Sequence, residues 1–327
     1  MADEAASPAF PVKVLYGIIH SHVDATSRTV KPSNFPGRFI FEDPGGDHER
    51  LRVISPAGDP ARQIVKKLFI YDAATNELLI ELPPFVFKYG IHFSSASELV
   101  STLSTFHATP AKLAKIHHRF AKVGFSGNYL EEYHEQLLAA AFIPPTAKVL
   151  ELGANVGRNT CVIGSILDDP SRLVSFETVH FDACVAKINL NKCGLPGVNV
   201  EIAAVSSIRL EQQSWLTRPI PPGQRDASAG WTEVKTIPYA RVVAKYGTFD
   251  TLVADCEGAL LFILRDAPEL LDTVKRIIVE NDYNDLAHYK EVVMHFINKG
   301  FRKVLYMGNL DAPFPTKPYF YEAWVRD

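Results

Sequence analysis

Polar residues, four of them acidic, follow two apolar runs that are predicted to be strands. They are Asp255 and Glu257 after the first run, and Glu280, Asn281 and Asp282 after the second. Asp255 and Glu257, two residues apart in an extended segment, point the same way. Paired carboxylates can divide into acid and base or hold a divalent cation such as Mg²⁺. Asp255, Glu257, Asn281 and Asp282 are therefore candidate catalytic residues, and Asp255, Glu280 and Asn281 candidate metal ligands. Alternatively, Asp255 or Glu257 binds a cofactor's amino group or caps the following helix.

A stretch at 148–160 predicts the site that would position these acids. It reads Lys-Val-Leu-Glu-Leu-Gly-Ala-Asn-Val-Gly-Arg-Asn-Thr, an apolar strand, a tight turn with Gly153 and Gly157, and the start of a helix. The turn and the first helical amides face any bound ligand, and Gly157 is expected to let the helix approach the strand. A second strand ends in Glu177, where a ribose with two hydroxyls would lie. This geometry suits NAD and S-adenosylmethionine alike.

Two details favour S-adenosylmethionine. The glycines do not follow the G-x-G-x-x-G spacing that lays a pyrophosphate on a helix N-terminus. Glu151 lies two residues before Gly153, and a carboxylate there repels a pyrophosphate but attracts a cationic amino group.

Four blocks of the sequence carry a family resemblance. They are ELGANVG, SFETVHFDACVAKINLNKCG, FDTLVADCEGALLFILRDAPELL and RIIVEND. In order and spacing they resemble the FkbM family of class I S-adenosylmethionine-dependent methyltransferases, over roughly residues 126–327. Thr178 stands where that family commonly has proline, and Leu260 replaces a frequent acid. The resemblance implies a Rossmann-like, seven-stranded α/β sheet and methylation of hydroxyls on sugars or polyketide-derived products. The candidate cofactor-binding residues are Glu151, Gly153, Ala154, Asn155, Gly157, Glu177, Thr178, Ala204 and Asp255.

The second half of the chain alternates strands and helices, which argues for a parallel sheet with the ligand at the carboxyl ends of its strands. A third strand is expected over 199–205, where Ala203 and Ala204 could let an adenine ring lie flat or simply pack. The runs 301–307 and 319–325 are expected to close the sheet as its last pair. The loop 218–231 could close over substrate with Trp231 against a sugar ring, or be a surface excursion with Trp231 packed at its base.

The first half reads differently. Short β-type runs separated by Pro, Gly and Asp clusters predict a small all-β, sandwich-like domain over 1–94, after a disordered leader. The runs lie at 12–19, 38–42, 51–54, 65–71, 77–82 and 85–89. This part weakly resembles β modules of glycan-modifying proteins in large viruses and bacteria, through Tyr16-Gly17, Asp24-Ala-Thr26, Gly58-Asp-Pro60 and the run 66–70. Either glycan recognition or a scaffold role is open to it.

A helical connector is predicted at 95–125, with helices over 98–106 and 110–122 and a further helix over 129–142 packed on the sheet. His107, His117 and His118 are expected to be solvated or linker histidines, because adjacent His117 and His118 point to different faces of a helix. The methyltransferase domain then spans 126–327.

Charge and composition exclude several classes. A formal net charge of -3 over 327 residues lacks the basic surplus of a nucleic-acid binder. The four cysteines show no CxxC spacing, which favours free thiols, and no run is long enough to span a membrane. A soluble, cytoplasmic protein is expected, and the weak resemblance of its first half is compatible with a viral origin. The leading hypothesis is an S-adenosylmethionine-dependent O-methyltransferase acting on a sugar or glycan. The alternatives are an NAD-dependent oxidoreductase and a catalytically silent glycan-binding protein.

Overall fold

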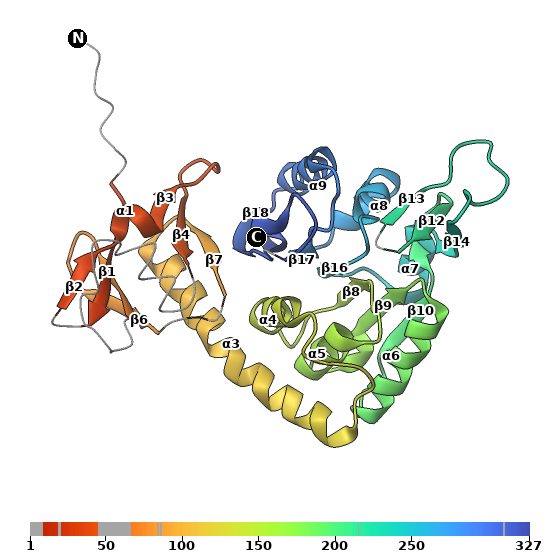
Figure 1. Cartoon of the computed structure of the whole chain (residues 1–327), viewed down its shortest axis with the longest axis horizontal. Coiled ribbons are helices and arrows are strands. Elements are labelled where there is room, and N and C mark those ends of the chain that lie inside the picture. Colours follow the sequence, from red (N-terminus) through yellow and green to blue (C-terminus); the bar gives the residue numbers. More distant parts are fainter. Residues whose placement is uncertain are drawn as a thin grey trace, which may run out of the picture. The chain divides into compact units, whose positions relative to one another are not determined.

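The chain forms two compact units (Figure 1). The computed structural model describes residues 9–18, 21–44, 67–83, 85, 87–214, 216–309 and 311–327. The first unit comprises 1–108 and 304–308, and the second comprises 109–303 and 309–327. The predicted strand at 51–54, the Gly58-Asp-Pro60 turn and the leader up to residue 8 lie outside the described residues. No described helix has the length and apolar character needed to cross a membrane.

The first unit is built mainly of antiparallel strands. One sheet has the order β2-β1-β5-β6, formed by Ser21–Asp24, Val12–Ile18, Lys67–Asp72 and Leu78–Leu82. The strands β3 (Val30–Pro32), β4 (Phe39–Asp43), β7 (Tyr89–Phe93) and β18 (Arg302–Met307) pair in that order. The unit also contains a short helix, α1 (Thr26–Thr29), and the beginning of α3. The predicted run 85–89 becomes a strand four residues later because Tyr89 is where pairing with β4 begins.

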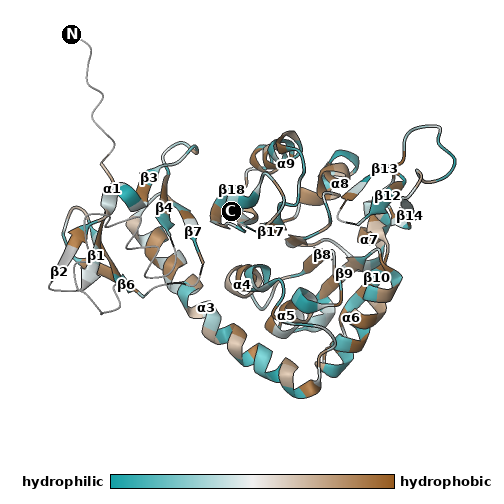
Figure 2. Cartoon of the chain, in the orientation of Figure 1, coloured by the Kyte–Doolittle hydropathy of each residue, from teal (hydrophilic) through white to brown (hydrophobic). Residues whose placement is uncertain are grey.

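The two helices predicted for the connector are a single helix, α3 (Ala96–Val123), which contains Pro110. Proline removes one backbone hydrogen bond and usually breaks a helix. Here an apolar stripe continues past it, with Leu103, Phe106, Leu113 and Ile116 buried at helical spacing. The turns of α3 accordingly alternate between hydrophilic and hydrophobic colours in Figure 2. Burial of this stripe outweighs the local cost of the proline.

The second unit is an α/β structure around a mostly parallel sheet. Its strand order is β10-β9-β8-β16-β17-β19, with the first five strands parallel and β19 antiparallel to β17. These strands are Asn199–Ile202, Leu173–Glu177, Val149–Leu152, Thr251–Ala254, Arg276–Glu280 and Tyr321–Val325. The predicted parallel sheet is therefore confirmed, with six of the seven expected strands adjacent within this unit. The predicted strand 199–205 breaks at Ala203, and its end, β11 (Ala204–Val205), pairs with β15 (Thr236–Ile237).

Helices cover both faces of this sheet. In Figure 1, α4, α5 and α6 lie on one face and α8 and α9 on the other. Their bounds are Tyr133–Phe142, Arg158–Ile166, His180–Lys192, Leu260–Asp266 and Leu286–Asn298, and α7 spans Tyr239–Tyr246. The helix α4 packs on β17 and β19, as predicted. The chain winds from β8 outward to β10 and then restarts on the other side at β16, so the sheet has a switch point between β8 and β16, where such sheets hold their ligands.

His117 is an exception to the expectation of solvated histidines. It is 7% exposed, and its Nε2 lies 2.7 Å from Oε1 of Gln136. Burial lowers its pKa, which keeps the ring neutral. His117 thus joins α3 to α4 in the core, whereas His118 is exposed as expected.

The predicted loop 218–231 belongs to a small antiparallel sheet. Strands β12 (Leu210–Gln213), β13 (Leu216–Pro219) and β14 (Thr232–Val234) pair in the order β13-β12-β14. Glu211 is fully buried and accepts hydrogen bonds from the backbone N–H and hydroxyl of Ser228 and from Nε of Arg218. The Arg218 guanidinium lies 3.9 Å from the centre of the Trp231 ring. One face of the Trp231 ring, the residue considered above for stacking on a sugar, is thus covered by Arg218.

Candidate functional site

The turn after β8 requires glycine at residue 153. Gly153 has φ +95, and a Cβ there would lie 1.5 Å from the carbonyl oxygen of Asp255. The backbone N–H groups of Gly153 and Ala154 both donate to the carbonyl of Phe176, at 2.9 and 3.0 Å. The turn is therefore fixed between the ends of β9 and β16.

Gly157, by contrast, serves helix packing. It has φ +86, and a Cβ there would lie 3.1 Å from Cα of Ala186 on α6. Gly157 was expected to let its helix approach the strand, but the element that comes closest to Gly157 is the helix α6. Gly157 does not line the cavity described below.

Glu177, at the end of β9, is held by the backbone. Its Oε2 accepts from the N–H of Asn155 and its Oε1 from the N–H of Val179, both at 2.7 Å. Burial raises its pKa, and these two hydrogen bonds oppose the rise. Thr178 next to it donates its hydroxyl to Oε1 of Gln212 at 2.7 Å. The Glu177 carboxylate is thus positioned before any ligand arrives and keeps lone pairs for further donors.

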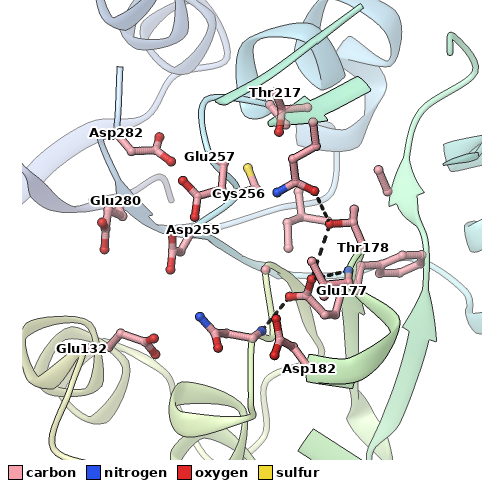
Figure 3. Close-up of a pocket in the computed structure, with 18 of the residues that line it drawn as sticks. Glu132, Glu177, Thr178, Asp182, Thr217, Asp255, Cys256, Glu257, Glu280 and Asp282 are labelled. Atoms are coloured by element: carbon pink, nitrogen blue, oxygen red, sulfur yellow. Dashed lines mark hydrogen bonds between the residues drawn. The ribbon is translucent and has the colours of Figure 1, made fainter. Parts of the chain in front are cut away.

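A cavity of about 620 Å³ opens at the carboxyl ends of β8, β9, β16 and β17 (Figure 3). Its wall includes Gly153, Asn155, Glu177, Thr178, Ala204, Asp255, Glu257, Glu280 and Asp282, all of which the sequence singled out. Ala203 and Val205 complete a strip of small apolar residues beside Glu177. Volume and location fit a nucleoside-sized ligand at the switch point of the sheet.

Four carboxyl groups gather on one side of this cavity: those of Asp255, Glu257, Glu280 and Asp282 (Figure 3). Burial and neighbouring carboxylates raise the pKa of Glu257 to about 8, and burial raises that of Asp282 to about 7. The pKa values of Asp255 and Glu280 also lie well above the ordinary range, for both of these reasons. Carboxyls of this kind can accept a proton near neutral pH.

The segment after β16 is not extended, contrary to expectation. Glu257 has φ +55, a left-handed conformation that is strained for a residue other than glycine. The backbone N–H of Gly258 donates to Oδ2 of Asp282 at 3.0 Å, which ties this turn to the end of β17. The left-handed turn changes the direction of the Glu257 side chain from that in an extended segment, while Asp255 and Asp282 still line the cavity.

The cavity wall is rich in carboxyl groups, part of which hold a proton near neutral pH because their pKa values are raised. Arg158 is the one cationic side chain among the described residues that line it. It forms ion pairs with Glu131 and Glu132, the latter at 2.7 Å. The carboxyl groups in the wall are those of Glu131, Glu132, Glu177, Asp182, Asp255, Glu257, Glu280 and Asp282. Such a wall repels phosphates and attracts cations.

Besides Gly157, three predicted residues lie outside the cavity wall. Glu151 is 1% exposed and does not line the cavity; its Oε2 accepts from the hydroxyl of Ser175 at 2.6 Å. Asn281 is 1% exposed, and its carboxamide donates to the carbonyl of Tyr319 at 2.8 Å. Ala154 is likewise buried outside the cavity wall. These three residues shape the site from behind.

The carboxyls that come closest to forming a metal site differ from the predicted set. One oxygen each of Glu135, Asp255 and Glu280 lie within 4.8 Å of one another, whereas Asn281 is turned away. Glu135, on α4, is 3% exposed and hydrogen-bonds Glu280, so the pair shares a proton when no cation is present. These oxygens are the ligand type that Mg²⁺ prefers.

Several residues of the wall were not predicted. Arg158, Asp182 and the pair Glu131-Glu132 lie in helical first turns or just before a helix, where acids and bases are common for reasons unrelated to ligands. Phe314 and Tyr321 come from the last part of the chain, in and before β19. The available hint was Glu131-Glu132, an acidic pair just before α4, the helix that precedes the glycine-containing turn.

No protein-family model and no curated protein matches the chain. The resemblance to the FkbM family therefore stays a prediction. Among solved structures, the O-methyltransferase from Bacillus cereus, in complex with S-adenosylhomocysteine (SAH), is similar with a TM-score of 0.38 and 14% identity, covering 66% of this chain and 91% of that one. The ribosomal protein L11 methylase from Lactobacillus delbrueckii gives 0.38 and 13%, covering 62% and 81%. An rRNA methylase from Streptococcus thermophilus gives 0.36 and 10%, covering 61% and 97%.

Proposed function

We propose that the second unit is an S-adenosylmethionine-dependent O-methyltransferase whose acceptor is a hydroxyl of a sugar or glycan. One observation carries the cofactor assignment: Glu177, a carboxyl group held by two backbone amides, stands in a cavity whose wall carries seven further carboxyl groups. Glu177 suits two ribose hydroxyls, and the strip at 203–205 suits an adenine ring. S-adenosylmethionine carries a net positive charge, which the wall favours, whereas the pyrophosphate of NAD would meet repulsion.

The chemistry follows from where the acids lie. When bound, S-adenosylmethionine would supply the methyl group, which the acceptor oxygen would attack in line while the carbon–sulfur bond breaks and its electron pair stays on sulfur. The hydroxyl proton passes to a carboxylate at the ends of β16 and β17, for which Glu257 and Asp282 are the candidates. A positioned base of this kind contributes roughly 10²–10⁴-fold in rate, and alignment on the order of 7–11 kcal/mol.

Glu135, Asp255 and Glu280 are the residues that would hold Mg²⁺ if the reaction uses it. The ion would supply Lewis-acid stabilisation of the acceptor oxygen. The sugar as acceptor rests on the resemblance to the FkbM family, and a glycan-binding role for the first unit would agree with it.

The test is calorimetric titration of the protein with SAH and, separately, with NAD. We expect saturable binding of SAH alone. Glu177→Gln should weaken SAH binding about 10- to 150-fold, because charge-assisted hydrogen bonds worth roughly 1.5–3 kcal/mol are lost.

Asp182→Asn is the matched control, since Asp182 lines the same cavity and loses the same charge. It should change SAH affinity less than three-fold. An equal loss in both variants would mean that net charge, and not the ribose contact, carries the binding. Binding of NAD alone would support an oxidoreductase, and binding of neither would support a silent, glycan-binding protein.

A further inference from the structure

The cavity holds more carboxyl groups than the proposed cofactor can use. Arg158 already pairs with Glu131 and Glu132, and Glu177 is assigned to the ribose. S-adenosylmethionine brings a sulfonium and an ammonium, offset by its own carboxylate, so it adds one net positive charge. The group formed by Asp255, Glu257, Glu280 and Asp282, here called the acceptor-side acids, supplies one base for the reaction and, when no metal ion is bound, leaves three further carboxyl groups.

The fold leaves two of the acceptor-side acids available to a ligand. Within the described residues, the carboxyl groups of Asp255 and Glu257 take part in no hydrogen bond, although both line the cavity. Asp282 is 5% exposed, and its Oδ2 accepts from the backbone N–H of Gly258. Burying carboxyls so close together is costly unless a cation joins them. A strained backbone at Glu257, with φ +55, maintains this arrangement.

Aromatic rings also line the cavity, and one of them, Tyr321, lies opposite Glu280 in the pairing of β17 with β19. Tyr321 lines it and stacks on His134, with ring centres 4.9 Å apart and planes 4° from parallel. Phe314 also lines it and stacks on Phe320 at 5.8 Å. Both rings are therefore held by neighbours. Rings and carboxylates around one space are the combination that binds organic ammonium groups.

Resting on the proposed function, we propose that the acceptor carries a protonated amino group beside the hydroxyl that is methylated, as in an amino sugar or amino alcohol with a free amine. The amino group lies among the acceptor-side acids and against Tyr321 or Phe314. An ammonium has no lone pair and cannot attack the methyl group, so the neighbouring hydroxyl is the nucleophile.

The experiment compares three probes of the same ring size. Protein saturated with SAH, in a metal chelator at pH 7.5, is titrated with glucosamine, N-acetylglucosamine and glucose. Acetylation removes the charge of the amine and keeps the ring. We expect glucosamine to bind at least ten-fold more tightly than either neutral probe.

Asp282→Asn and Glu257→Gln should each reduce this preference at least five-fold, and SAH binding shows whether each variant has folded. Glu201→Gln, an acid outside the cavity that pairs with Lys245, is the control and should leave the preference unchanged. Equal binding of the three probes, tighter binding of a neutral one, or no binding of glucosamine at 20 mM would overturn the proposal while SAH binding continued to support the methyltransferase. Loss of SAH binding in the parent protein would instead remove the proposed function itself.

Discussion

The stability of the protein should depend on pH through Glu151, which is buried behind the turn that follows β8. The sequence places Glu151 at the cofactor, whereas the structure buries it behind the turn. Its Oε2 accepts from the hydroxyl of Ser175, and its Oε1 has no hydrogen-bond partner among the described residues. Burial raises its pKa from an ordinary 4.5 to about 7. Folding therefore favours the protonated carboxyl, so its contribution to stability is full below pH 4.5 and is lost as the pH rises through 7.

Glu151→Gln keeps a neutral hydrogen-bonding group of the same shape. The raised pKa corresponds to roughly 3 kcal/mol, of which roughly 2–3 kcal/mol falls between pH 5 and pH 8. Urea unfolding of the ligand-free protein should therefore show parent and variant similar at pH 5 and the variant more stable by that amount at pH 8. SAH affinity should change less than three-fold.

Ser175→Ala is the companion variant, because its hydroxyl lowers the pKa of Glu151, and its loss should steepen the fall of stability with pH. The reasoning fails if parent and Glu151→Gln show the same pH dependence within about 0.5 kcal/mol, near the error of such measurements. A ten-fold loss of SAH affinity in a variant that is stable at pH 5 would return Glu151 to the cofactor.

Two further predictions concern the turn at Gly153 and the cluster of carboxyl groups formed by Glu135, Asp255 and Glu280. Gly153→Ala should destabilise the protein by about 2–5 kcal/mol and abolish SAH binding, because its Cβ would meet the backbone of Asp255 at 1.5 Å. The control is Gly194→Ala. Gly194 has φ +73 and no atom within 4 Å of an added Cβ, so this change should lower the free energy of unfolding by only about 1–2 kcal/mol. Millimolar Mg²⁺ should raise the melting midpoint of the parent and, because Glu280 supplies one of the three oxygens, not that of Glu280→Gln. A chelator should reverse the shift, and an unchanged midpoint in the parent would remove the ion from this site.

The sheet of the second unit could be predicted because its strands are short apolar runs buried on both faces and separated by helical patterns. Gly153 and Glu177 were predictable for a related reason, since a tight turn and a strand-ending acid have few other uses at that spacing. The acids after β16 and β17 were found because parallel strands bring their carboxyl ends to one edge.

Other features depend on contacts that spacing does not reveal. The positions of Glu151 and Asn281 along the chain are compatible with a place in the site. In the structure their polar groups are instead hydrogen-bonded to the hydroxyl of Ser175 and the carbonyl of Tyr319, both distant in sequence. Pro110 ends a helix by local rules and fails to do so here because the apolar stripe continues. Arg158 and Tyr321 reach the cavity from elements whose sequence shows only ordinary helix-start and strand patterns.

The acidic wall also bears on how one turnover leads to the next. In the proposed reaction, methyl transfer would remove the positive charge on sulfur while a carboxylate gains the acceptor's proton, so the net charge inside the cavity would not change. SAH can therefore remain without electrostatic penalty while that proton stays. Release of the proton to solvent restores the negative wall, which a new sulfonium satisfies and a neutral thioether does not. If the proposed function holds, exchange of spent for fresh cofactor would be coupled to deprotonation of the acid at the ends of β16 and β17.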